Sequence, residues 1–288
     1  MWLKMEYKVK DRLNNQIIIK ESKINIFLYN TKVGRILLKL LILPFISKIV
    51  GLYQDSRLSK KVIPKFIKNN HINMNDYERV EYKSFNDFFT RKIKEGKRVI
   101  DKDKYNLISP CDAKLKVYKL NKDNVFNIKN SKYTINDLID NNSNINFDNG
   151  YVLVFRLCVD DYHRYSYIDN GYQENNNYIK GVLHTVRPIA TNNLNVFTQN
   201  ERCFTILHTE NFGDVYQIEV GALMVGKIVN EYDNYEFYKG EEKGYFKFGA
   251  STIVLIIDNI DIDEDILINS ENDVETIVKL GEKIGRKC

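Results

Sequence analysis

The segment around Ser251 could allow this chain to cleave itself. Ser251 follows the small residues Gly249 and Ala250 and opens a run of strand-forming residues. Small residues before a serine leave the preceding carbonyl accessible and allow unusual backbone angles. In such a geometry the Ser251 hydroxyl can attack the Ala250 carbonyl and break the chain there. Taken alone, these residues are far more typical of an ordinary turn that starts a strand.

Two other segments carry side chains that could assist a hydroxyl. Asp112 comes just after the turn that Pro110 fixes, and His163 comes at the end of a strand-like run. A serine hydroxyl is a weak nucleophile at neutral pH and needs a base. Without its neighbouring motifs, His163 is better interpreted as a hydrogen-bonded histidine at a strand end.

The sequence lacks the motifs of metal sites, nucleotide-binding enzymes and ordinary serine hydrolases. The four histidines form no HxH, HxxxH or HExxH pair, and no Cys/His cluster has zinc spacing, so we expect no metal site. The sequence also lacks a GxxxxGK(S/T) phosphate loop, a GxGxxG fingerprint and a GxSxG elbow. The usual nucleotide enzymes and ordinary serine hydrolases are therefore not supported.

The composition is that of a soluble globular protein with an uneven charge. The 288 residues are 43% hydrophobic and 28% charged. Four scattered cysteines without a CxxC pair predict reduced thiols in a cytosolic protein. Residues 1–100 hold 22 Lys and Arg against 9 Asp and Glu, a net charge of +13, whereas the remaining residues carry −8. The basic end is expected to meet an anionic surface, either nucleic acid or anionic lipid.

The most apolar long stretch lies in this basic region, from Val33 to Tyr53. Its uninterrupted core, Leu40–Ser47, is too short to span a bilayer, and cations interrupt the wider stretch. Pro44 is expected to kink the helix. Apolar residues with interspersed lysines favour a helix lying in a membrane interface. A helix packed on the body of the protein is the alternative.

The rest of the chain has the pattern of an antiparallel β protein. Runs rich in Val, Ile, Phe and Tyr alternate with Asn, Gly and Asp turns; they are Tyr151–Val159, Phe204–His208, Val215–Val220, Leu223–Val229 and Ser251–Asp258. We expect an exposed insert at Asn121–Gly150, and an acidic loop with a short final helix at Ile260–Cys288. A short helix after Ser84, with Asp87 completing a capping box, is also expected. The predicted fold class is α+β, with a helical, basic N-terminal region (1–83) followed by a mostly antiparallel β body (84–288).

Several blocks occur in an order that resembles the phosphatidylserine decarboxylases, in the bacterial, pyruvoyl-dependent, prokaryotic type II-like form. The resemblance runs from about residue 55 to 258. The blocks are FNDFFTR at 85–91, SPCD at 109–112, DYHR at 161–164, VGALMVG at 220–226 and KGEEKGYFKFGAST at 239–252. Asn200–Arg202 matches a further block, although Glu201 and Arg202 could instead form an ion pair.

The resemblance implies a self-processing carboxy-lyase of phospholipid biosynthesis. Ser251 would attack Ala250, and elimination and hydrolysis would leave a β-chain (1–250) and an α-chain (251–288) that begins with a pyruvoyl group made from Ser251. His163 would be the base, and Asp112 would orient it. The amine of phosphatidylserine would form a Schiff base with the pyruvoyl ketone, which accepts electrons as CO2 leaves. His163 would then reprotonate the carbon to give phosphatidylethanolamine, with Thr252 supporting the new terminus.

Two positions depart from the family pattern. Ala250 stands where the family usually has glycine, and its Cβ restricts the backbone. Ser166 stands where many members have a second histidine, three residues after His163. Either His163 serves both steps, or His184 or His208 supplies the missing group from elsewhere in the chain.

These departures keep a second hypothesis open, a processing-deficient, non-enzymatic relative that binds membranes. No nucleic-acid partner is expected, because the chain has no RRM, KH or helix-turn-helix signature. The expected partners are phosphatidylserine and an anionic membrane surface. The two chains would stay together as a heterodimer, and a homo-oligomer is left open. The expected location is the cell membrane, as a peripheral protein on its cytoplasmic side, without a span.

Overall fold

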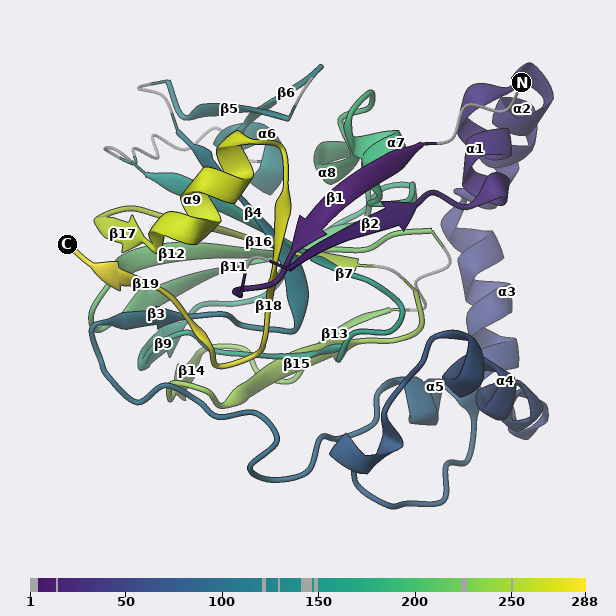
Figure 1. Ribbon diagram of the computed structural model, residues 1–288, viewed down its shortest axis with the longest axis horizontal. Helices are drawn as coiled ribbons and strands as arrows, with labels where there is room; N and C mark the ends of the chain where they lie inside the picture. The colour runs from purple at the N-terminus through teal and green to yellow at the C-terminus, as the bar shows by residue number, and fades with distance from the viewer. Residues whose placement is uncertain are drawn as a thin grey trace.

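A large twisted β-sheet forms the centre of the computed structural model (Figure 1), which describes residues 5–13, 15–120, 123–128, 130–140, 147, 150–223, 227–249 and 251–288. The described pairings in this sheet are antiparallel, except that β1 runs parallel to β18. In spatial order the sheet contains β14 (Tyr235–Phe237), β9 (Gly171–Gln173), β11 (Arg202–Thr209), β12 (Gly213–Val220), β16 (Ser251–Ile257), β7 (Tyr151–Leu157), β4 (Ala113–Lys119), β18 (Glu275–Val278), β1 (Glu6–Lys10) and β2 (Gln16–Lys20), with β10 (Asn177–Ile179) beside β11.

Smaller sheets and short helices surround this sheet. The smaller sheets are β13 (Ile228–Asn230) with β15 (Glu242–Phe246) and β8 (Arg164–Ser166); β17 (Ile260–Ile262) with β19 (Lys283–Lys287) and β3 (Asn106–Ile108); and β5 (Val125–Ile128) with β6 (Ser131–Thr134). The helices are α1 (Lys23–Asn30), α2 (Lys32–Leu41), α3 (Pro44–Asp55), α4 (Ile63–Asn69), α5 (Phe85–Phe89), α6 (Ile135–Ile139), α7 (Pro188–Thr191), α8 (Val196–Gln199) and α9 (Glu264–Glu271), with 3-10 turns η1 (Arg57–Val62) and η2 (Met74–Asp76). The predicted α+β class is confirmed.

The centre of the sheet is buried on both faces. All seven residues of β16 are buried, and successive side chains alternate between two hydrophobic cores. Ile253 and Leu255 pack into one core, and Val254 and Ile256 pack into the other. A strand covered on both faces needs a continuous apolar sequence rather than an alternating one. The runs predicted as strands at 151–159, 204–208, 215–220 and 251–258 are confirmed as β7, β11, β12 and β16, within one or two residues at most ends.

The helices at the N-terminal end form a column along one side of the sheet (Figure 1). Pro44 is the first residue of α3, and α2 and α3 are bent by 66° at this break. Proline fits the first turn of a helix because that position needs no backbone N–H donor. The predicted kink is therefore confirmed. Within the described residues, no single helix has both the length and the apolarity to cross a membrane.

The helical expectation for the N-terminus is wrong in its first part. Residues 6–10 and 16–20 form the hairpin β1–β2, and Val9 and Lys10 of β1 pair in parallel with Glu275 and Thr276 of β18. These strands therefore extend the main sheet, and the helices start only at Lys23. Residues 6–10 form a strand because they pair with β18, which is distant in the sequence, and such a non-local contact leaves little local signal in the sequence.

Four other predictions need correction. Residues of 121–150 are not an exposed insert, because Phe126, Tyr133 and Leu138 are buried in a hydrophobic core. The C-terminal segment contains β17, β18 and β19 besides α9, and it ends in a strand rather than a helix. The run 223–229 is not one strand, since β13 begins at Ile228; residues 224–226 lie outside the described part. Ser84 caps α5 as predicted, but the Asp87 carboxylate accepts from the Lys83 amide instead of that of Ser84.

Candidate active site

Ser251 occupies the first position of β16, at the edge of the sheet's buried centre. It pairs with Leu157 of β7 on one side, and Thr252 pairs with Val220 of β12 on the other. Ser251 and Thr252 are fully buried, and neither hydroxyl has a hydrogen-bond partner among the described residues. A buried polar group left without a partner costs about 1–3 kcal/mol. These two hydroxyls are therefore poorly explained by stability alone.

The segment that leads into Ser251 contains a backbone conformation that favours glycine. Gly249 has φ +139°, in a region that residues with a side chain rarely adopt. Just before it, the Phe248 amide donates to the Asn86 side-chain oxygen over 3.0 Å. Asn86 belongs to α5, so the FNDFF block anchors the approach to Ser251. Ala250, the predicted residue before the cleaved bond, lies outside the described residues.

His163 is held as a neutral base. Its Nδ1 lies 2.9 Å from the Asp161 carbonyl oxygen, which can only accept, so Nδ1 carries the proton. Burial lowers the pKa of His163 to about 3. The ring is therefore neutral at physiological pH, with its lone pair on Nε2. This atom is buried and has no partner among the described residues.

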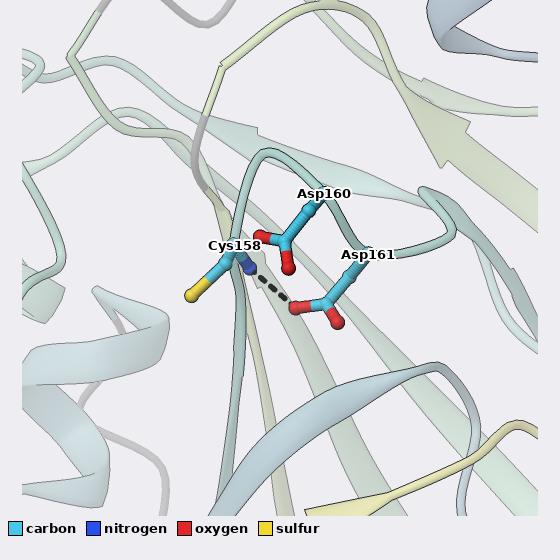
Figure 2. Close-up of side chains that lie close together, drawn as sticks. All are labelled: Cys158, Asp160 and Asp161. Carbon is cyan, nitrogen blue, oxygen red and sulfur yellow. Dashed lines mark hydrogen bonds between the residues drawn. The ribbon is translucent and has the colours of Figure 1, made fainter. Parts of the chain in front are cut away.

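A tight turn after β7 brings His163 to the end of the sheet where Ser251 lies. Figure 2 shows the Cys158 amide donating to the Asp161 carboxylate. This hydrogen bond is 2.7 Å long, and the Asp161 amide donates back to the Cys158 carbonyl over 2.9 Å. Cys158 immediately follows Leu157, the partner of Ser251. The Phe89 ring of α5 packs on the imidazole, with ring centroids 4.1 Å apart. The fold thus places a base and a hydroxyl, neither with a partner among the described residues, at one end of the sheet.

Cys158, Asp160 and Asp161 lie close enough together to resemble a metal site (Figure 2). The Asp161 carboxylate, however, already accepts from the Lys114 ammonium over 2.6 Å and from the Cys158 amide. Although burial lowers the pKa of Lys114, the Asp161 charge raises it above its ordinary value, so this cation neutralises the carboxylate. The grouping is explained as the turn that presents His163.

Asp112 is placed differently from the expectation. Its carboxylate accepts from the guanidinium of Arg98, from the Lys279 ammonium over 3.2 Å and from the Leu280 amide over 3.0 Å. Burial raises the pKa of Asp112, but Arg98 and Lys279 hold it below its ordinary value. No hydrogen bond within the described residues joins it to His163. The group that orients the His163 ring is instead the Asp161 carbonyl, which the spacing of the DYHR block could have suggested.

The remaining candidates from the sequence, Ser166, His184 and His208, lie in three different places. Ser166 lies at the Asp112 turn, where its amide donates to the Pro110 carbonyl over 2.9 Å. His184 lies at the Ser251 end of the sheet, because the Asn200 side chain bridges its carbonyl and that of Gly221.

The His184 ring contacts the Tyr29 hydroxyl at 3.2 Å, and burial lowers its pKa. His208 lies far from Ser251. It stands six residues along β11 from Arg202, which is about 20 Å, and it pairs with Asp214 and Glu174.

A cavity of about 270 Å³ opens between α3 and this end of the sheet, a feature that the sequence did not indicate. Its lining residues are Pro44, Ser47, Lys48, Leu183, Glu201, Gly221, Lys227 and Ile228. Glu201 lines it and does not pair with Arg202, whose guanidinium donates to backbone carbonyls such as those of Leu138 and Asn200. The site therefore combines a hydroxyl, a base and a cavity of small-molecule size.

The sequence matches known proteins over nearly all of this structure. The family model described as phosphatidylserine decarboxylase matches residues 85–286. A protein of Clostridium acetobutylicum named phosphatidylserine decarboxylase proenzyme 2 is 51% identical over 263 residues, which cover 90% of each chain. Phosphatidylserine decarboxylase proenzymes of Clostridium botulinum (strain Hall) and Clostridium tetani are 46% and 41% identical, over 90% and 93% of this chain and 91% and 93% of their own.

Proposed function

Because this chain belongs to the phosphatidylserine decarboxylase family, we propose that it is a precursor that cleaves itself between Ala250 and Ser251 and then converts phosphatidylserine to phosphatidylethanolamine and CO2. One observation carries the proposal. The buried hydroxyl of Ser251 has no partner among the described residues and follows a glycine at φ +139°. A neutral histidine, whose Nε2 has no partner in the described part of the chain, lies at the same end of the sheet.

The cleavage uses groups of this chain and one water molecule. His163 Nε2 takes the Ser251 hydroxyl proton as Oγ bonds to the Ala250 carbonyl carbon, and the C–N bond breaks to leave an ester and a free amine. Loss of the Ser251 Cα proton then breaks the Cβ–Oγ bond of the ester and releases the Ala250 carboxylate. Water hydrolyses the resulting enamine, through its imine tautomer, to a ketone and ammonia. The product is an α-chain of residues 251–288 that begins with a pyruvoyl group.

The surroundings of Ser251 fit such a group. Position 251 is buried between β7 and β12, and the Thr252 hydroxyl next to it has no partner among the described residues and can donate to a new carbonyl. When present, the pyruvoyl group supplies an electron sink for the carbon that loses CO2. The role of this chain is then to hold the headgroup and exclude water. His163 Nε2 would first take a proton from the headgroup ammonium and would then deliver it to the carbon that loses CO2.

The two chains produced by cleavage would stay together. β16 pairs with β12 and β7, while β18 and β19 pair with β4 and β3. All of the α-chain strands except β17 thus pair with strands of the β-chain, and Ile253 to Ile257 remain in the cores. Separating them would expose this apolar surface, which is strongly unfavourable.

The proposed reaction is tested by CO2 release from phosphatidylserine labelled in the serine carboxyl group. Purified wild-type protein in detergent micelles should release labelled CO2, and prior treatment with borohydride, which reduces ketones, should abolish the release. The non-enzymatic alternative predicts no release at all. Labelled CO2 that is insensitive to borohydride would contradict a ketone-dependent reaction.

We further propose that α2 and α3 attach the protein to the cytoplasmic face of the membrane. Both helices expose large apolar side chains, including Ile36, Leu40, Phe45 and Leu52, each more than half exposed. Arg35 and Lys39 accompany them. Cations near an anionic leaflet each contribute about 1 kcal/mol, and buried aliphatic side chains contribute about 1.5–3 kcal/mol each. The bend between the helices and their short lengths suit a helix pair lying in the interface.

Replacing Ile36, Leu40 and Phe45 together with serine should weaken binding to vesicles containing phosphatidylserine by at least about 100-fold, since three apolar contacts are lost. The measurement is vesicle flotation at increasing salt, which should also weaken wild-type binding. Val99→Ser is the matched control, because Val99 is 78% exposed and lies outside α2 and α3. Equal flotation of the triple variant and the wild type would rule out this surface.

A further inference from the structure

The cavity beside α3 lies next to the residue that the proposed cleavage converts. Val220 pairs with Thr252, and continuing this register by one residue brings Gly221, a lining residue, across from Ser251. Ile228, also a lining residue, pairs with Phe246 of β15. The Lys247 amide donates to the Lys227 carbonyl over 2.9 Å. One wall of the cavity therefore comes from the end of β12, which runs beside position 251, and from the start of β13, which pairs with the segment leading into that position.

The opposite wall belongs to α3 and carries an unusual polar atom. Ser47 is only 3% exposed, and its hydroxyl has no hydrogen-bond partner in the described part of the chain. A buried serine hydroxyl on a helix normally bonds to a backbone carbonyl or to water. Because Ser47 is one of the residues that line a cavity of about 270 Å³, a ligand oxygen that enters the cavity is a natural partner for this hydroxyl.

Two cations border the same cavity. Lys48 follows Ser47 on α3, and Lys227 reaches it from the opposite side; both are exposed. Neither lysine forms an ion pair within the residues that the structure describes. Glu201 adds one negative charge to the wall. Two lysines and a hydroxyl donor are suited to a phosphate group, and the carboxylate is suited to a nearby ammonium.

Resting on the proposed function, we propose that this cavity holds the phosphoserine headgroup, with the Ser47 hydroxyl and the Lys48 and Lys227 ammonium groups bound to its phosphodiester. The headgroup amine then lies toward Glu201 and position 251. On α3, Phe45 and Ile49 are exposed beside Ser47 and Lys48. The helix that contacts the bilayer therefore also selects the lipid headgroup.

Binding can be measured without turnover in the uncleavable Ser251→Ala chain. The ligand is short-chain dihexanoyl phosphatidylserine below its micelle concentration, and the method is calorimetric titration. Adding Lys48→Ala or Ser47→Ala to this chain should raise the Kd about tenfold. Lys65→Ala, which removes an exposed lysine of α4 outside the cavity, is the matched control and should leave the Kd unchanged.

Thermal unfolding separates a binding role from a structural one. Removing a hydroxyl that has no partner among the described residues should not lower the Tm, so Ser47→Ala is expected to lose affinity at unchanged or higher Tm. Inorganic phosphate is the second probe, and it should bind at least tenfold more weakly than the lipid.

An unchanged Kd in the Lys48 and Ser47 variants, an equal loss in Lys65→Ala, or equally tight binding of free phosphate would overturn the proposal. These outcomes are separate from failure of the proposed function, which would appear as wild-type protein that stays whole and releases no CO2.

Discussion

Replacing Ser251 with alanine is expected to leave a single full-length chain with no detectable decarboxylation. The substitution removes the oxygen that attacks Ala250 and the atoms from which the ketone is made. The variant should nevertheless fold normally, because the Ser251 hydroxyl has no hydrogen-bond partner in the described structure and its loss leaves no group unsatisfied. Gel electrophoresis, thermal unfolding and CO2 release together check this expectation.

Ser270→Ala is the matched control for this variant. Ser270 is another buried serine of the same C-terminal segment, but its hydroxyl accepts from the Val117 amide over 3.0 Å. The control should cleave and react normally while losing about 1–3 kcal/mol of stability. A Ser251→Ala protein that still divides into two chains would show that another residue carries the cleavage.

Replacing His163 with alanine is expected to slow self-cleavage by about 10²–10⁴-fold, the usual contribution of a positioned general base. The rate can be followed by pulse-chase labelling of freshly translated protein. Since burial lowers the pKa of His163 to about 3, the wild-type rate should be flat between about pH 5 and 8. An inflection near pH 6.5 would mean that a solvated histidine, rather than His163, is the base.

Stability provides a second readout of the same histidine. An unfolded histidine takes up a proton near pH 6.5, whereas the folded ring does so only near pH 3. Between these values the unfolded state binds more protons, so the Ser251→Ala chain should lose stability as the pH falls through this window. In the double variant with His163→Ala this part of the loss should disappear. His163→Asn, which can still donate to the Asp161 carbonyl, separates loss of the base from loss of that hydrogen bond.

Local sequence patterns predicted the fold class and the central strands, and they singled out Ser251 and His163 as candidate site residues. Ser251 and His163 stand in short blocks whose residue types reveal their chemistry, and the strands that carry them are continuous apolar runs. The β1–β2 hairpin was missed because its place in the sheet depends on pairing with β18, more than 260 residues later. One partner of Asp112, Lys279, was missed for the same reason, since it approaches from the far end of the chain.

The cavity beside α3 could not be predicted from local patterns. Ser47 and Lys48 belong to an apolar helix, while Gly221 and Lys227 come from a loop and a strand end. Only the packing of α3 against the sheet brings these residues together. Helix amphipathicity indicates that a face is exposed, but it does not indicate which strand end the helix covers.

The most direct test is the intact mass of freshly purified wild-type protein, measured together with its CO2 release. Self-cleavage before Ser251 should give two chains, one ending at Ala250 and one of 38 residues beginning at position 251. The smaller chain should be lighter by one ammonia than a simple hydrolysis fragment, as a pyruvoyl terminus requires. A single unbroken chain that still releases CO2 from phosphatidylserine would contradict the account.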